Sequence, residues 1–330
     1  MDRYALVQDW LTRRLPGRTF SLSPASADAS FRRYFRVTLA DATLIVMDAP
    51  PEHEDCRPFV EVAGLMAAAG LNVPNILAQD LTQGLLLLSD LGSTTYLAAL
   101  NDGNADVLFS DATTALIRWQ LASREGVLPL YDEALLKREL DLFPEWYLRR
   151  HLGIELDVRQ QQSLDAVFRL ILANNLAQPR TYVHRDFMPR NLMLTDPNPG
   201  VLDFQDAVYG PITYDVASLF KDAFLSWDKQ RVLDWTIRYW ERARLAGLPV
   251  NNDFGEFYRD CEWMGLQRHL KVLGIFARIC HRDGKPAYVK DTPRFLGYVR
   301  AVAERYALLS PLLRLLDQLA DRKPVIGYTF

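Results

Sequence analysis

A short polar constellation near residue 190 constrains this chain more than any other feature of its sequence. His184-Arg185-Asp186 is followed five positions later by Asn191, and Asp203 ends an apolar run soon afterwards. The residues between Asn191 and Asp203 are two apolar runs that flank a turn-forming segment, a pattern typical of a β-hairpin. We therefore expect a loop and an adjoining hairpin to bring three oxygen-bearing side chains toward one point.

These three side chains suit phosphoryl transfer. One carboxylate can orient and deprotonate an attacking hydroxyl, while two further oxygen ligands can hold Mg²⁺ on nucleotide phosphates. Taken singly, each residue would be explained by turn hydrogen bonds or by capping of the hairpin. Together they match the H-x-D-x-x-x-x-N catalytic-loop signature of kinases, to which His184 also belongs. The pattern predicts Asp186 as the base and Asn191 with Asp203 as the metal ligands.

The remaining sequence predicts an α+β chain with two parts, which suits 330 residues at about 150 per domain. Apolar positions spaced three and four apart dominate from residue 96 onward, so that region is expected to be mostly helical apart from the hairpin. We predict a small β-rich N-lobe over residues 1–90 and a large, mostly helical C-lobe over residues 91–330. The N-lobe strands are expected at 34–39, 43–47, 73–79 and 85–89, with helices at the N-terminus and at 58–69.

Composition excludes several classes of protein. A net charge of −3 disfavours a nucleic-acid binder, which is usually basic. Cys56, Cys261 and Cys280 are too far apart for a zinc motif, and their number suits a reducing compartment. The N-terminus lacks a signal-peptide pattern, and the most apolar run, Leu85 to Leu88, is too short to span a bilayer. We expect a cytoplasmic protein with no nucleic-acid or membrane partner.

Two further motifs lie beyond the hairpin. Asp203-Phe204-Gln205-Asp206 stands where protein kinases have Asp-Phe-Gly, and Gly210-Pro211-Ile212-Thr213-Tyr214-Asp215-Val216-Ala217 follows it. With the loop signature, these motifs resemble the aminoglycoside phosphotransferase-like (choline kinase-like) branch of the protein-kinase fold. The resemblance implies a two-lobe kinase-like fold, ATP and Mg²⁺ as cofactors, and a role for Asp215 in bracing the catalytic loop.

A finer resemblance covers nearly the whole chain, and several long stretches carry it. They are Asp28 to Arg36, Val46 to Pro51, Leu142 to Tyr147, Arg268 to Lys271 and Phe276 to Pro286. These stretches resemble the bacterial N-acetylmuramate/N-acetylglucosamine anomeric kinases of peptidoglycan recycling. That family implies phosphoryl transfer from ATP to the anomeric hydroxyl to give the α-1-phosphate, with a small amino sugar as the partner. We expect the protein to be a monomer.

The phosphate-binding part of the N-lobe departs from the kinase pattern. There is no G-x-G-x-x-G between the first strands, so the phosphate-covering turn would be Ser26 to Ser30. Kinases bind phosphate with a lysine on their third strand. This chain has no lysine before Lys137, and Met47 or Asp48 stands near the place of that missing lysine. Another basic group must therefore neutralise the α- and β-phosphates.

Three arginines just after this turn are candidates for that role, because a guanidinium can hold phosphate through two hydrogen bonds. They are Arg32, Arg33 and Arg36, and the alternative is that all three are solvated charges at a strand edge. Glu61 would pair with one of them.

Beyond the last N-lobe strand, the backbone of Asp90 and Leu91 would bind adenine. The side chain of Asp90 is expected to stabilise a turn rather than contact the nucleotide.

The acceptor site would lie in the C-lobe. Between residues 259 and 300 there are nine Lys or Arg against four acids, a balance that disfavours a polycationic aminoglycoside. Arg268, Lys271 and Arg278 could share a helix face and contact substrate, or could simply face water. Trp146 could stack on a sugar ring or belong to the core, and Asp206 could accept a sugar hydroxyl, contact a second metal or cap the chain.

Two alternatives remain open at this point. A small-molecule kinase of another acceptor, such as an aminoglycoside or choline, would share the same catalytic residues. The missing lysine also allows a pseudokinase that binds a partner without turnover, although a decayed site usually loses its metal-binding residues and base as well.

Overall fold

The computed structural model describes residues 2–25 and 31–319, and the chain divides into two compact units. The first contains residues 1–119 together with 189–207, and the second contains residues 120–188 and 208–330. This division differs from the lobe boundary at residue 90, which stays a prediction. Within the described residues, every helix is too short or too polar to cross a membrane.

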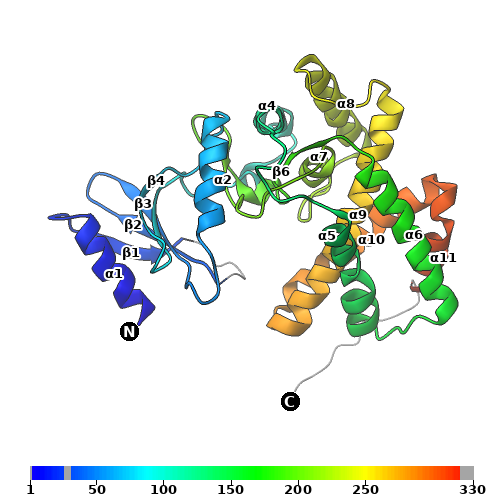
Figure 1. Cartoon of the computed structure of the whole chain (residues 1–330), viewed down its shortest axis with the longest axis horizontal. Coiled ribbons are helices and arrows are strands. Elements are labelled where there is room, and N and C mark those ends of the chain that lie inside the picture. Colours follow the sequence, from blue (N-terminus) through cyan, green and yellow to red (C-terminus); the bar gives the residue numbers. More distant parts are fainter. Residues whose placement is uncertain (1, 26–30, 320–330) are drawn as a thin grey trace. The chain divides into compact units, whose positions relative to one another are not determined.

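The first unit is built around a five-stranded antiparallel sheet in the order β1-β2-β3-β5-β4 (Figure 1). Its strands are β1 (Ser21–Pro24), β2 (Arg33–Thr38), β3 (Thr43–Asp48), β4 (Ile76–Asp80) and β5 (Leu85–Ser89). Four of the five confirm the predicted strands. The sequence analysis missed β1, because Ser21, Ser23 and Pro24 give that strand little apolar character.

Apolar side chains of the strands lie on both faces of this sheet. Successive side chains of a strand point to opposite faces, so Val46 and its register partner Leu87 share one face while Met47 and Leu86 share the other. All four are buried. On the first face they pack against α1 (Arg3–Arg14), which contributes Val7, Trp10 and Leu11 to the same core cluster. An N-terminal helix therefore closes one side of the sheet.

The other elements of the first unit are helical except for the hairpin. They are α2 (Arg57–Ala68), α3 (Tyr96–Ala99), α4 (Ala105–Leu121), the 3₁₀ turn η2 (Pro189–Asn191), and the hairpin strands β7 (Leu192–Met193) and β8 (Gly200–Val201). The predicted hairpin is confirmed, although its paired strands are shorter than expected. Gly70 has a φ of 76° after α2, a conformation in which glycine avoids the steric cost of a side chain.

The second unit is mostly helical. Its elements are α5 (Glu133–Leu140), the π-helix η1 (Phe143–His151), α6 (Val158–Leu176), β6 (Arg180–Val183), β9 (Val208–Pro211), α7 (Tyr214–Phe220), α8 (Lys229–Leu245), α9 (Phe254–Asp283), η3 (Pro286–Asp291), α10 (Thr292–Arg305), η4 (Ala307–Leu309) and α11 (Ser310–Leu319). The helical path is interrupted near Pro144, because α5 ends at Leu140 and η1 begins at Phe143.

One strand pair in this unit was missed by the sequence analysis. β6 and β9 form a two-stranded antiparallel sheet, with Val183 opposite Val208. Both strands have only four residues, too few for a clear alternation of apolar and polar side chains. The pair matters for the site because β6 leads directly into His184, and β9 leads into α7.

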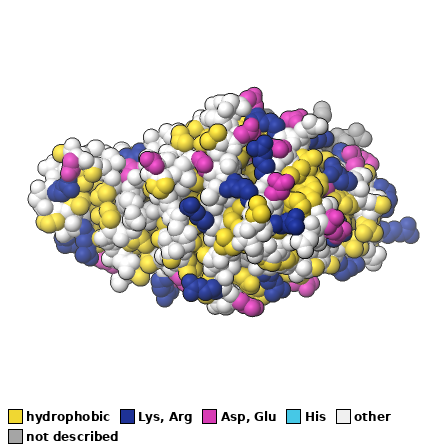
Figure 2. Space-filling model, turned by 90° about the horizontal axis from the view of Figure 1, so that it is seen from above, with side chains coloured by type: hydrophobic (Ala, Val, Ile, Leu, Met, Phe, Trp, Pro, Cys, Tyr) yellow, Lys and Arg dark blue, Asp and Glu magenta, His cyan; other side chains and the backbone are white. Residues whose placement is uncertain are grey.

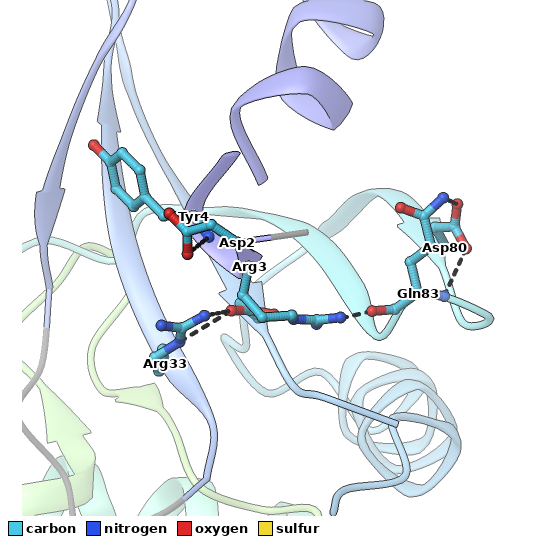
Figure 3. Close-up of polar contacts among 7 residues, drawn as sticks. Asp2, Arg3, Tyr4, Arg33, Asp80 and Gln83 are labelled. Atoms are coloured by element: carbon cyan, nitrogen blue, oxygen red, sulfur yellow. Dashed lines mark hydrogen bonds and ion pairs between the residues drawn. The ribbon is translucent and has the colours of Figure 1, made fainter. Parts of the chain in front are cut away.

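A buried carboxylate ties α1 to the sheet of the first unit. Asp48, at the end of β3, is 0% exposed. The Nε atoms of Arg3 and Arg33 each donate to one of its oxygens at 3.0 Å, and Arg3 also donates to the carbonyl oxygen of Gln83 at 2.9 Å. Figure 3 shows Arg3 extended toward Gln83 while Arg33 approaches from the neighbouring strand. Asp48, which stands near the place where kinases have their phosphate-binding lysine, therefore stabilises the first unit instead.

We expect Arg3→Met to lower the free energy of unfolding of the chain by about 1–3 kcal/mol, because it removes charge-assisted hydrogen bonds to a buried carboxylate. Chemical denaturation measures this change. Arg57→Met is the matched control, since the ion pair of Arg57 with Asp55 is exposed and should contribute little. Equal stabilities of the two variants would contradict the structural role of Arg3.

Candidate active site

The second unit presents Asp186 on a short loop that follows β6. His184 is fully buried, whereas Asp186 is partly exposed and its carboxylate can therefore meet a substrate. The Nδ1 atom of His184 accepts a hydrogen bond from the backbone N–H of Asp186 at 3.3 Å. The imidazole thus acts as a local support for the loop and leaves Asp186 as the residue available for chemistry.

Asp215 holds the same loop from the first turn of α7. Its two carboxylate oxygens accept backbone hydrogen bonds from His184 at 2.7 Å and from Arg185 at 3.0 Å. Asp215 is 0% exposed. Burial raises the pKa of Asp215 to about 7, and the two backbone donors oppose that rise. The bracing contact expected of Asp215 is present in the structure.

Buried cations around Asp186 favour its ionised form. Burial alone would raise the pKa of Asp186, but the charge of Lys271, followed by that of Arg268, holds the pKa below its ordinary value. Both cations lie on α9 and are at most 8% exposed. A carboxylate kept ionised in this way can receive a proton from a hydroxyl group.

The first unit carries the two candidate metal ligands on either side of its hairpin. The Nδ2 atom of Asn191 donates to an oxygen of Asp203 at 3.2 Å, and the Nε2 atom of Gln205 donates to the other oxygen at 2.9 Å. Asp203 is exposed and has a φ of 64°. A non-glycine residue in this region costs roughly 1–2 kcal/mol, and such strain often occurs at functional sites.

Contacts with the rest of the first unit fix the hairpin. Asn72 accepts a hydrogen bond from the backbone of Val201 at 2.7 Å. In the turn, the Nδ2 atom of Asn198 donates to the Tyr96 hydroxyl and to Asp111, each at 2.8 Å. These contacts hold the hairpin in place, and Asn191 and Asp203 lie at its two chain ends.

The donor set at the hairpin suits Mg²⁺. This cation prefers oxygen ligands and commonly binds through one or two carboxylates together with substrate phosphates. Asn191 and Asp203 offer an amide oxygen and an exposed carboxylate, and Asp206, also exposed, lies three positions on. No cluster of three His, Cys, Asp or Glu side chains that could hold a metal exists in the described parts of the chain. The protein ligands alone would therefore leave most of the coordination sphere to phosphate and water.

The arginines expected at the nucleotide each have a carboxylate partner. Arg32 pairs with Glu54 at 2.8 Å, Arg33 with Asp48, and Arg36 with Asp90 at 2.7 Å. The prediction that Glu61 pairs with one of them is wrong, because Glu61 lies exposed on α2 and the acidic partners come from other elements. The turn from Ser26 to Ser30 lies outside the described residues.

The side chain of Asp90, just after β5, stabilises a turn. Asp90 accepts a hydrogen bond from the backbone N–H of Gly92 at 2.9 Å, in addition to its pairing with Arg36. This confirms the expectation that the Asp90 side chain serves a turn. Binding of adenine by the backbone of Asp90 and Leu91 stays a prediction.

Two of the residues expected to contact the acceptor, Lys271 and Arg268, are buried. Lys271 donates to Glu139 and to the Tyr214 hydroxyl, both at 3.0 Å, so its contacts lie inside the protein. Arg268 is 2% exposed, and its Nη2 atom lies 3.6 Å from the sulfur of Met188. These two cations therefore act on Asp186 through their charge rather than from an open surface.

Two other expected acceptor contacts are partly exposed. Trp146 packs against the core of the second unit, and the guanidinium of Arg150 lies 4.5 Å from its ring centroid. Burial lowers the pKa of Arg278, with the nearby charge of Arg282 acting in the same direction.

Sequence reasoning missed Glu139 altogether, because an isolated acid within an amphipathic helix carries no motif.

Known proteins resemble this chain along most of its length. The sequence model of the phosphotransferase enzyme family (APH) matches residues 21–248. A protein of Pseudomonas aeruginosa named N-acetylmuramate/N-acetylglucosamine kinase is 59% identical over 90% of this chain and 88% of its own length. A protein of Neisseria meningitidis with the same name is 50% identical over the full length of both chains.

Solved structures show the same fold at much lower identity. Choline kinase LicA from Streptococcus pneumoniae superposes with a TM-score of 0.65 at 14% identity, over 92% of this chain and 100% of the other. The ADP-bound aminoglycoside phosphotransferase APH(2'')-Ib gives 0.60 at 14% identity, over 90% and 98%. The predicted kinase-like fold, with a small antiparallel sheet and a large helical part, is thereby confirmed. The chain belongs to the phosphotransferase enzyme family.

Proposed function

We propose that this protein is an ATP-dependent kinase that phosphorylates the anomeric hydroxyl of N-acetylmuramate and N-acetylglucosamine, giving the α-1-phosphate in peptidoglycan recycling. The observation that carries the proposal is the 50% identity, over the full length of both chains, with a protein named for these two acceptors. The Asp186 loop and the Asn191–Asp203 pair supply the residue types that the reaction needs. We expect the protein to act in the cytoplasm.

Asp186 would orient the attacking hydroxyl and receive its proton. An anomeric hydroxyl is more acidic than other sugar hydroxyls, so a carboxylate with a low pKa is a sufficient base. Asn191 and Asp203 would hold Mg²⁺, which neutralises charge on the phosphate oxygens of ATP when it is bound. His184 and Asp215 would keep the Asp186 loop in its position.

Among the three N-lobe arginines, Arg32 is the strongest candidate for the missing lysine's role. Arg33 is committed to the fully buried Asp48, and Arg36 donates both to Asp90 and to the carbonyl oxygen of Gly92. Arg32 lies next to the Ser26–Ser30 turn in sequence, and its partner Glu54 is 19% exposed. A guanidinium in this position can exchange a carboxylate for a phosphate at modest cost. Ser30, Arg33 and Arg36 would support the nucleotide from the same region.

The acceptor would be a small molecule with hydroxyl groups, contacted by Asp206, Trp146 and Arg278. The excess of Lys and Arg between residues 259 and 300 fits an acceptor that is neutral or, like N-acetylmuramate, carries a carboxylate. On the face shown in Figure 2, basic and acidic side chains are interspersed, without the basic stripe that nucleic-acid binding requires. We expect a monomer with no macromolecular partner.

Replacing Arg32 tests its role at the nucleotide. Arg32→Ala should raise the KM for ATP by about 10- to 100-fold, because it removes charge-assisted hydrogen bonds to phosphate. Glu54→Gln breaks the same ion pair but leaves the guanidinium in place, so its KM for ATP should stay within about 3-fold of wild type. Steady-state kinetics with varied ATP provides the measurement. Equal effects of the two variants would assign Arg32 a structural role only.

The acceptor is tested by ADP release with ATP and Mg²⁺ in the presence of N-acetylmuramate, N-acetylglucosamine or kanamycin. Wild type should turn over the two amino sugars, and Asp186→Asn should lose at least about 100-fold in kcat because the base is removed. Asp234→Asn, on the exposed side of α8, controls for the substitution. Turnover with kanamycin alone would overturn the proposed acceptor, whereas ATP binding without turnover on any acceptor would support a pseudokinase.

A further inference from the structure

The residue before Asp186 has an unusual backbone conformation. Arg185 has a φ of 76°, in the left-handed region that residues other than glycine seldom adopt. This conformation costs roughly 1–2 kcal/mol and must be offset by its surroundings. It also sets the direction in which the next side chain, Asp186, leaves the backbone. Whatever holds Arg185 in this conformation therefore controls the position of Asp186.

Arg185 is held through both its backbone and its side chain. Its backbone N–H donates to Asp215, and its guanidinium donates to an oxygen of Glu139 at 2.6 Å. The guanidinium also lies 5.6 Å from the ring centroid of Tyr131. Glu139 is only 5% exposed and receives a further hydrogen bond from the Tyr131 hydroxyl. The side chain of Arg185 is thus anchored in a buried, charged pocket formed by α5 and the residues before it.

Lys271 of α9 connects these two supports. Its ammonium group donates to the same Glu139 oxygen that binds Arg185, and to the hydroxyl of Tyr214, each at 3.0 Å. Tyr214 directly precedes Asp215, the residue that accepts the backbone hydrogen bonds of the loop. Lys271 therefore contacts both the anchor of the Arg185 side chain and the neighbour of the residue that fixes the backbone. Three helices, α5, α7 and α9, meet at this one ammonium group.

We infer that Glu139 and Lys271 are positioning residues for the catalytic loop, which hold Arg185 in its left-handed conformation and so direct Asp186 toward the acceptor hydroxyl. A network that served stability alone would not need to converge on the residue next to the base. Buried ion pairs add little net stability compared with apolar side chains of the same volume. Their retention at this place is explained by the geometry that they impose on the loop. The inference rests on the proposed function only for its kinetic readout.

The kinetic test uses Lys271→Met and Glu139→Gln in the full-length protein, assayed well below their melting temperatures. Each should lower kcat by about 10- to 100-fold, since a displacement of about 1 Å in a reacting group has an effect of this size. The KM values for ATP and the amino sugar should change by less than about 3-fold. Lys271→Arg keeps the charge and should recover part of the lost kcat. Glu133→Gln, the same change on an exposed residue of α5, should behave as wild type.

Amide hydrogen exchange gives a second readout that needs no turnover. The N–H groups of His184, Arg185, Asp186 and Met188 all have acceptors within the second unit. Exchange in residues 184–188 should become faster in Lys271→Met and Glu139→Gln, and should stay unchanged in Glu133→Gln. If Lys271→Met does not fold, Tyr214→Phe replaces it, because that variant removes only one acceptor of the ammonium group.

Three results would overturn the inference. The first is wild-type kcat and wild-type exchange in the folded variants. The second is a lower kcat without faster exchange in residues 184–188. The third is a higher KM for the amino sugar with an unchanged kcat, which would make Lys271 a substrate contact. If wild type fails to phosphorylate either amino sugar, the proposed function falls, while the exchange measurement still decides the positioning role.

Discussion

The candidate active site depends on one carboxylate that accepts two successive backbone hydrogen bonds. Asp215 fixes His184 and Arg185 at the end of a strand of only four residues, which by itself could not hold the loop. These bonds orient the peptide groups on both sides of His184, and the peptide group after Arg185 is oriented by the hydrogen bond from the Asp186 N–H to His184. The left-handed conformation of Arg185 therefore persists, and the position of Asp186 follows. The cost of burying the carboxylate is reflected in its raised pKa, and the two donors offset part of that cost.

The candidate site residues of the two units are surrounded by charge in different ways. In the second unit the cations Lys271 and Arg268 are buried, where a low dielectric strengthens their effect on Asp186. In the first unit Asp203 is exposed, as a carboxylate must be if it is to meet a hydrated cation and a nucleotide. Internal charges therefore tune the base, and surface charges are left for ligands. Arg268 and Lys271, two of the candidate substrate contacts, are accordingly enclosed in the protein.

Much of the fold could be predicted from the sequence because its signals are local. The strands at 34–39, 43–47 and 85–89 show runs of β-branched or apolar residues between turn formers, and the helices of the second part show regular apolar spacing. The elements that were missed are short. β1, β6 and β9 have four residues each, and their pairing is decided by partners elsewhere in the chain. Asp186, Asn191 and Asp203 could be singled out because their spacing forms a motif, and Asp215 because the stretch around it resembles that of a known family.

The class of chemistry can be inferred from the amino-acid order alone, because the catalytic loop, the hairpin and the motif around Asp215 occupy fixed positions along a short stretch of chain. The pairing of charged side chains follows only from the folded chain. Arg3 and Asp48 are 45 residues apart, and Glu139, Arg185 and Lys271 come from separate elements. A periodic pattern shows that a helix has an apolar face, but it does not show which charged side chain of that helix is enclosed. That outcome depends on the partners that packing brings within hydrogen-bonding distance, because a charge is buried only where an opposite charge meets it.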